Sequence, residues 1–231
     1  PLSVIAGELR LQGGPPDAAD LATMLSAMRT RAPDASASHA TGPVLLGHAQ
    51  LRTGASRAEA MPRLSLEPHA FVVADARIDN RDALVSRLRA SGRDARADDP
   101  HAELILHAYH AFGEHCAKHL HGDFAFAIWD ARRQALFLAR DRFGVRPLYW
   151  ALLPDRLLFA SDMRALLALR AVPRELDERS LADFLMLGTC LDARATIHRH
   201  IRCVAPASWA RATPDGLEDR AYWRLPEEQD T

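Results

Sequence analysis

The sequence predicts an α+β fold in which two antiparallel sheets pack face to face between two outer layers of helices, an αββα sandwich. Apolar, β-rich runs come in groups with pairs of helical segments between them, an order typical of antiparallel sheets rather than of alternating strands and helices. Several runs, VLLGHAQL and ALFLA among them, are apolar on both faces. Such strands suit a sheet covered by a second sheet on one side and by helices on the other.

The amino-terminal part of the chain predicts a strand, a helix and two more strands. PLSVIAGEL is a short apolar run, and we expect residues 3–6 to form a strand buried between the sheets. Residues 17–31 carry apolar side chains at helical spacing, which predicts an amphipathic surface helix that Pro33 closes. The runs 43–52 and 70–78 are apolar and β-rich, with a polar stretch between them, and predict two neighbouring strands.

The remaining elements follow from local signals. Asn80 can cap a helix that ends near Gly92, and Pro100 opens a second helix directly after it. From Asp123 onward, four short apolar runs (DFAFAIWD, ALFLARD, PLYWALL and LLFASD) follow one another in quick succession, which predicts an antiparallel meander. Two helices are then predicted at 163–169 and 180–187, and a hairpin turning at Pro-Asp-Gly ends the fold.

Composition excludes several classes of protein. The 231 residues include 29 Lys plus Arg and 30 Asp plus Glu, a net charge of −1, so no bulk charge favours nucleic acid or an anionic membrane. No apolar stretch is long enough to span a bilayer. The three cysteines, Cys116, Cys190 and Cys203, follow no spacing motif and predict reduced thiols. We therefore expect a cytoplasmic protein.

The run GDFAFAIWDARRQALFLARDRFGVRPLYW, followed by LLFASDMRALLAL and AYWRLP, resembles the amino-terminal glutaminase domain of asparagine synthetases. That domain is a class II glutamine amidotransferase with an Ntn-hydrolase fold, and the resemblance implies one such domain over residues 1–231. In the family, the first strand carries Cys-Gly-Ile-Ala-Gly with the cysteine as terminal residue. Its thiol attacks the glutamine amide and its free α-amine serves as the base.

The resemblance also implies that the pocket has changed at each functional position. Alignment on Ile-Ala-Gly puts Ser3 at the nucleophile, behind two further residues. Gln50 stands where the family has the arginine that holds the substrate carboxylate. Asp75 and Ala76 replace the Asn-Gly pair that binds the oxyanion. His101 occupies the place of the aspartate that binds the substrate ammonium. These substitutions predict a degenerate glutamine pocket with no catalytic residue.

Members of this family that lack the cysteine include β-lactam synthetases and lasso-peptide macrolactam cyclases. By resemblance, the chain is expected to support an ATP-dependent amide-forming ligase, and in particular a lasso-peptide isopeptide-forming cyclase. Its partners would be a C-terminal synthetase domain of the same parent protein, which would hold ATP and Mg²⁺, and a precursor peptide. No cofactor is expected in this chain, because it has no glycine-rich phosphate loop.

Two other functions stay open. The first is an active amidohydrolase, which would require trimming of the chain to Ser3. The second is a stand-alone module that binds a ligand or peptide in the altered pocket, with Asp75 and His101 as polar contacts. Ammonia release by the trimmed chain would indicate the first, and stabilisation by a ligand would indicate the second.

Other conspicuous residues have simpler interpretations. Histidines cluster between residues 107 and 121, and His115 and His119 have the i, i+4 spacing of a chelating pair. The favoured interpretation is an exposed histidine-rich face, so no metal site is expected. Asp141 lies in a tight turn and is expected to bond backbone amides there. The four tryptophans lie in or beside apolar strands and are expected to pack in the core.

Overall fold

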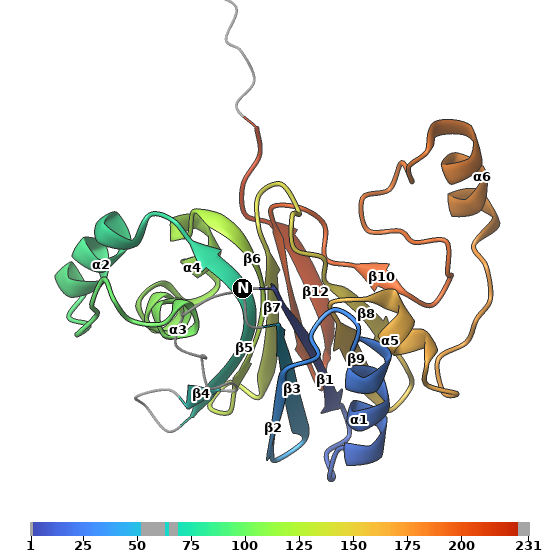
Figure 1. Ribbon diagram of the computed structural model, residues 1–231, viewed down its shortest axis with the longest axis horizontal. Coiled ribbons are helices and arrows are strands. Elements are labelled where there is room, and N and C mark those ends of the chain that lie inside the picture. The colour runs from blue at the N-terminus through green and yellow to red at the C-terminus, as the bar shows by residue number, and fades with distance from the viewer. Residues whose placement is uncertain (1, 52–62, 65–68, 226–231) are drawn as a thin grey trace, which may run out of the picture.

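Two six-stranded sheets stack on each other between layers of helices (Figure 1). The structure is a computed structural model that describes residues 2–51, 63–64 and 69–225. The first sheet has the order β10 (Arg202–Cys203), β8 (Tyr149–Leu152), β9 (Arg156–Ala160), β1 (Leu2–Arg10), β3 (Val44–Leu51) and β2 (Ala35–Thr41). The second has the order β12 (Gly216–Ala221), β11 (Ser208–Thr213), β7 (Ala135–Arg140), β6 (Gly122–Asp130), β5 (Ala70–Ile78) and β4 (Arg63–Leu64).

Helices cover the outer face of each sheet. The first sheet carries α1 (Ala18–Ala27) and α5 (Met163–Leu167), and the second carries α2 (Arg81–Ala90), α3 (His101–Phe112), the short turn η1 (Gly113–His115) and α4 (Cys116–His119). A further helix, α6 (Glu178–Leu187), stands away from the sandwich (Figure 1). The predicted four-layer α+β architecture is confirmed.

Three apolar clusters correspond to the three interfaces between these layers. The cluster between the sheets takes alternate residues from β1, β5, β6, β7 and β9, because successive side chains of a strand point to opposite faces. Trp129 and Trp209 are buried in the core, as expected for all four tryptophans. Trp150 and Trp223 are only partly buried where they pack against the clusters. All three cysteines are free thiols, with Cys116 and Cys203 buried.

The amino-terminal strand β1 lies in the middle of the first sheet, paired with β3 on one side and β9 on the other. Gly7 allows close packing there, because a Cβ at this position would meet the Phe159 ring at 2.5 Å and the Leu45 carbonyl oxygen at 2.6 Å. The Ser161 hydroxyl accepts a hydrogen bond from the Ile5 N–H at 2.9 Å. The strand is therefore held by its neighbours along its length.

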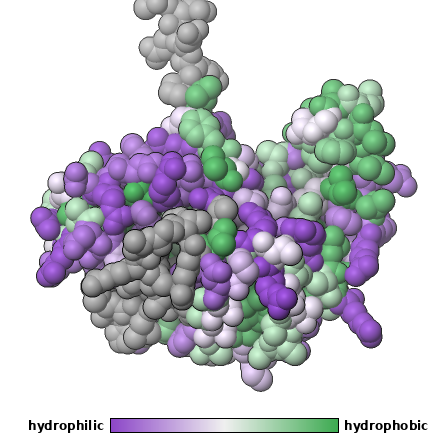
Figure 2. Space-filling model, viewed as in Figure 1, coloured by the Kyte–Doolittle hydropathy of each residue, from purple (hydrophilic) through white to green (hydrophobic). Residues whose placement is uncertain are grey.

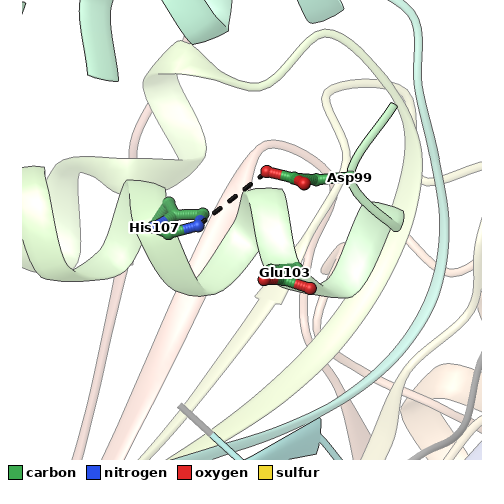
Figure 3. A group of neighbouring side chains, drawn as sticks. All are labelled: Asp99, Glu103 and His107. Carbon is green, nitrogen blue, oxygen red and sulfur yellow. Dashed lines mark ion pairs between the residues drawn. The ribbon is translucent and has the colours of Figure 1, made fainter. Parts of the chain in front are cut away.

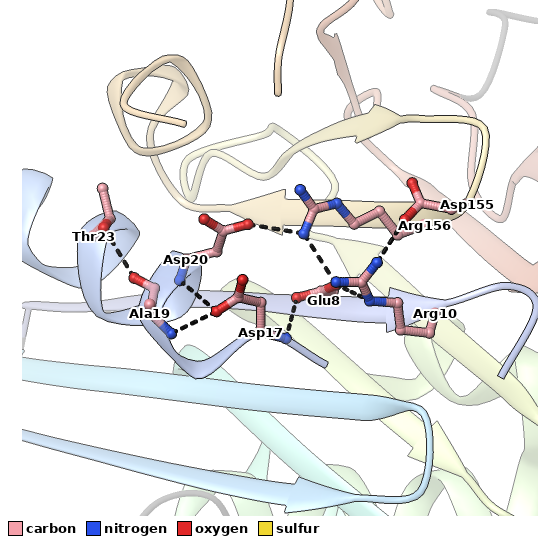
Figure 4. Close-up of polar contacts among 8 residues, drawn as sticks. All are labelled: Glu8, Arg10, Asp17, Ala19, Asp20, Thr23, Asp155 and Arg156. Carbon is pink, nitrogen blue, oxygen red and sulfur yellow. Dashed lines mark hydrogen bonds and ion pairs between the residues drawn. The ribbon is translucent and has the colours of Figure 1, made fainter. Parts of the chain in front are cut away.

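A buried carboxylate connects β1 to α1 and β9 (Figure 4). Glu8 is fully buried and lies 2.6 Å from Arg10 Nε and 3.3 Å from Arg156 Nη1. It also accepts the backbone N–H of Asp17, the N-cap residue of α1, at 3.0 Å. Arg156 Nη1 reaches Asp20 of the same helix at 2.8 Å. These contacts fix where α1 begins on the sheet.

Two predictions about strand pairing are wrong. The runs 43–52 and 70–78 do form β3 and β5, but the two strands lie in different sheets. The place beside β3 is taken by β2, whose sequence ASASHAT is small and polar and so gives a weak strand signal. The expected meander is likewise split, since β6 and β7 pair in the second sheet and β8 and β9 in the first.

The chain passes between the sheets at 141–148 and again at 204–207, and these two crossings lie side by side. The Val204 N–H donates to the Leu148 carbonyl oxygen, and the Ala207 N–H donates to the Asp141 carbonyl oxygen. The Arg140 guanidinium donates to backbone carbonyl oxygens in both crossings, among them Val204 at 3.0 Å. The Asp141 carboxylate accepts three amides of its own loop, at 2.9–3.1 Å, as expected from the sequence.

The helix after Asn80 begins where predicted, but the side chain of Asn80 does not cap it. Its amide donates to the His119 carbonyl oxygen and its carbonyl accepts the His121 N–H, both at 2.9 Å. Asn80 therefore joins the start of α2 to the end of α4. Within the residues described, no helix combines the length and apolar character needed to cross a membrane.

Candidate functional site

The start of β1 meets β5 of the second sheet, and this corner contains three of the predicted pocket residues. Ser3 is 7% exposed and pairs in register with Gln50 of β3. The backbone amide of Ser3 lies near enough to the Asp75 side chain on β5 to lower the pKa of its carboxyl. The fold thus brings Ser3, Gln50 and Asp75 together from three strands.

Asp75 is the most unusual group in this corner. It is 2% exposed, and burial raises the pKa of its carboxyl to about 6, against the opposing effects of Arg146, the Ser3 amide and Arg31. Arg146 Nη1 lies 3.4 Å from Oδ2, whereas Oδ1 has no hydrogen-bond partner among the residues that the structure describes. At neutral pH the corner therefore holds a largely ionised carboxylate with incomplete compensation.

Two arginines of the site were not expected from the sequence. Arg146 follows the Asp141 turn, whose bond to the Arg146 N–H helps to fix the backbone from which this guanidinium extends. Arg31 follows α1, and its Nη1 lies 3.6 Å from Asp162 Oδ2. Its positive charge also lowers the pKa of Asp75. The signal that could have found Arg146 is the GVRPLYW segment, since a basic residue directly before a buried strand stands next to the layer interface.

The other two predicted positions lie away from Ser3. Ala76 follows Asp75, so it faces the helices on the outer side of β5 and packs partly buried against their cluster. His101 begins α3, and its Nδ1 accepts the Ile78 N–H at 3.1 Å and lies 2.8 Å from Arg81 Nη1. Ile78 is three residues beyond Asp75, roughly 10 Å along the strand. The structure therefore places His101 at the corner between β5 and α2.

The histidine pair considered as a chelate is not arranged as one. His115 is exposed, whereas the His119 ring stacks on Phe112 with centroids 4.0 Å apart. His119 Nδ1 lies 3.3 Å from Arg87 Nη1, and burial together with nearby cations lowers the pKa of His119. A ring stacked on Phe112 and facing a guanidinium is poorly placed to share a metal ion with His115.

The chemistry available at the corner is limited. The nitrogen of Ser3 belongs to a peptide bond, so it cannot accept a proton as a free α-amine would. The Ser3 hydroxyl is a weak nucleophile unless a base activates it. The nearest charged group on β5, Asp75, repels any negative charge that develops beside it.

A face-to-face pair of antiparallel sheets, with the amino-terminal strand central and its first residues facing the second sheet, defines an Ntn-hydrolase-type amidotransferase fold. Comparison with known proteins agrees, since the family model described as "Glutamine amidotransferase domain" matches residues 2–223. The chain belongs to this family.

Similar proteins include asparagine synthetase [glutamine-hydrolyzing] 3 of Bacillus subtilis (strain 168), 34% identical over 161 residues, which are 69% of this chain and 26% of that protein. Amidase chyE of Penicillium rubens is 32% identical over 146 residues, 63% of this chain and 20% of that protein. The chain thus spans about a quarter of the length of these curated relatives.

Among solved structures, the glutamine phosphoribosylpyrophosphate amidotransferase of Bacillus subtilis, complexed with ADP and GMP, has a TM-score of 0.66. It is 15% identical and the match covers 96% of this chain and 50% of that one. At this level of identity, the match supports the fold alone.

Proposed function

We propose that this chain is a glutamine amidotransferase-like domain that no longer hydrolyses glutamine and that supports an ATP-dependent amide-forming ligase of the asparagine synthetase family. The observation that carries this proposal is the buried carboxylate of Asp75, held against the amide of Ser3. By family resemblance this is the place of a neutral oxyanion donor.

The energies argue against hydrolysis at several steps. A carboxylate about 4 Å from a developing oxyanion raises its energy by about 4 kcal/mol at an effective dielectric constant of 20. A donor in that position instead lowers the barrier by roughly 3–4 kcal/mol. Gln50 offers a neutral amide where a guanidinium would hold the substrate carboxylate, which forgoes a charge-assisted bond of about 1.5–3 kcal/mol.

The partner of the domain is proposed to be a C-terminal synthetase domain, which would bind ATP and Mg²⁺. The chain spans about a quarter of its curated relatives, which leaves room for such a domain. An exposed apolar surface is available for contact: we define the α6 patch as Phe184, Leu185, Met186, Leu187 and Leu191, which are 50–82% exposed. Figure 2 shows these hydrophobic residues gathered on the projecting lobe. Large exposed apolar patches mark interaction sites.

The particular ligase we propose is an isopeptide-forming cyclase that closes a lasso peptide, with the precursor peptide as second partner. The altered pocket supports this choice, since an enzyme that uses an amine of its own substrate has no need of ammonia from glutamine. A product that contains a new amide linkage, formed by the parent protein only in the presence of ATP, is the expected result.

Ammonia release from glutamine tests the loss of hydrolysis. We expect none above background from the chain as given, nor from a form trimmed so that Ser3 is terminal. The matched control is the trimmed form with Ser3→Cys, Gln50→Arg, Asp75→Asn and Ala76→Gly together, which restores the family's thiol, clamp and oxyanion donors. Release by the trimmed chain without these changes would overturn the proposal.

A second candidate is an amidohydrolase acting on another amide, and the fungal relative named amidase chyE favours it. It predicts hydrolysis of simple amides by the trimmed chain, and that hydrolysis would be lost in Ser3→Ala.

The third candidate is a stand-alone module that binds a ligand or peptide in the altered pocket. It predicts a ligand-dependent rise in melting temperature that Asp75→Asn abolishes.

A further inference from the structure

We infer that Asp99, Glu103 and His107 form a binding site for a single divalent transition-metal ion of the zinc type. The site lies on the outer helical layer, at the start of α3, and is separate from the corner at Ser3. It does not depend on the proposed function.

The three side chains converge because of their spacing. Glu103 and His107 are four residues apart in α3 and therefore project from the same side of the helix, and Asp99 lies in the loop just before it. One ligand atom from each lies within 4.8 Å of the other two. Figure 3 shows Asp99 reaching in from the loop toward the two helical side chains.

His107 supplies an independent reason to expect a ligand. Its side chain is 4% exposed, and its Nε2 has no hydrogen-bond partner among the residues that the structure describes. Asp99 Oδ2 lies 4.0 Å from this nitrogen, which is too far for a hydrogen bond. A buried polar atom without a partner destabilises the folded state, and a bound metal ion would supply that partner.

The donor set matches zinc chemistry. Imidazole nitrogen and carboxylate oxygen both bind Zn²⁺, at about 2.0–2.2 Å, which places the ligand atoms of a tetrahedral site about 3.4 Å apart. The observed atoms therefore need to approach by roughly 1 Å. Asp99 and Glu103 are only partly buried, whereas buried His107 provides the fixed ligand. Water would take the fourth position.

The surroundings fix Asp99 and also oppose a cation. Asp99 Oδ2 accepts the Arg96 N–H at 2.7 Å, which orients the carboxylate as outer contacts of metal ligands do. Arg81 donates to the Asp99 carbonyl oxygen and brings a positive charge near the site. The two carboxylates outweigh that charge. An occupied site would hold the loop before α3 against the helix.

Calorimetric titration of the chelator-treated chain with ZnCl₂ tests this inference. We expect one Zn²⁺ per chain and a rise in melting temperature on binding. Glu103→Gln changes a partly exposed side chain and should weaken binding by at least about tenfold. His107→Asn should do the same. Because His107 is buried, the readout for this variant is the zinc-dependent shift rather than the absolute melting temperature.

The matched control is the double variant His115→Asn/His119→Asn, which removes two neighbouring histidines outside the site and should leave stoichiometry and affinity unchanged. Zinc binding that survives Glu103→Gln and His107→Asn but is lost in the control would assign the metal to the other histidines. That result, or no binding at all, would overturn the inference.

Discussion

At the scale of the residue, Asp75 determines the charge of the corner at Ser3. Its neighbours on β5 are apolar, and the Arg146 guanidinium compensates only part of its charge. Since the pKa of a carboxyl in water is 3.8 and burial raises that of Asp75 to about 6, the folded state holds its proton more tightly than the unfolded state does. Stability should therefore fall as pH rises through this window, by about 3 kcal/mol in total.

Asp75→Asn removes the destabilisation that the buried, ionised carboxylate causes at neutral pH. We expect the variant to exceed the native chain in free energy of unfolding by about 1–3 kcal/mol at pH 7.5, and to lose the advantage near pH 3, where Asp75 is largely protonated in both states. Urea denaturation at the two pH values measures the difference.

Asp162→Asn is the matched control, because its effect has the opposite sign. Although burial opposes it, hydrogen bonds and charge from Arg164 lower the pKa of Asp162. This variant should be less stable than the native chain at pH 7.5 and similar to it at low pH. Equal behaviour of the two variants would contradict the assignment.

The sequence predicted which residues occupy the pocket but not how they are charged. Ser3, Gln50 and Asp75 could be located because the Ile-Ala-Gly strand and the apolar run at 70–78 are strong local signals. The pKa of Asp75 and the approach of Arg146 could not, because both depend on the packing of one sheet on the other. Asp99, Glu103 and His107 repeat every four residues, but only the folded chain places their ligand atoms within 4.8 Å of one another.

At the scale of the element, β1 shows how closely the strands pack. Gly7→Ala would place a methyl group 2.5 Å from the Phe159 ring and 2.6 Å from a backbone oxygen of Leu45, neither of which can move cheaply. We expect a loss of about 1–3 kcal/mol or more in free energy of unfolding, measured by denaturant titration.

Gly47→Ala, in the adjacent strand β3, is the control for strand propensity. Its methyl group would meet the end of the Leu21 side chain, the closest atom at 2.8 Å, and that side chain can rotate. The cost should be clearly smaller than for Gly7→Ala. The reverse order would show that the close approach of Phe159 does not limit this strand.

The elements that sequence reasoning located well are those with a strong pattern, such as β5 and α3. Their pairing across the sandwich was harder to predict, because β2 is made of small polar residues and the turn at Asp141 does not reveal that the chain changes sheet there. A period-two pattern identifies a strand but does not specify its partner.

At the scale of the whole molecule, the α6 patch is expected to contact a synthetase domain. Leu185→Glu/Met186→Glu should leave the thermal unfolding of this chain within about 0.5 kcal/mol, because both side chains are largely exposed. The same change in the parent protein should weaken the association of its two domains, measured by binding of separately produced halves. Glu178→Lys, on the same helix but outside the patch, is the control. Unchanged association would remove α6 from the interface.

The paired crossings at 141–148 and 204–207 have a consequence for how such a protein can change over time. Their hydrogen bonds involve the Arg140 guanidinium, the Asp141 carboxylate and backbone groups. At the Ser3 corner they reach only the backbone of Arg146, so they do not depend on the side chains of Ser3, Gln50 or Asp75. The connection between the two sheets can therefore persist while those three side chains are replaced.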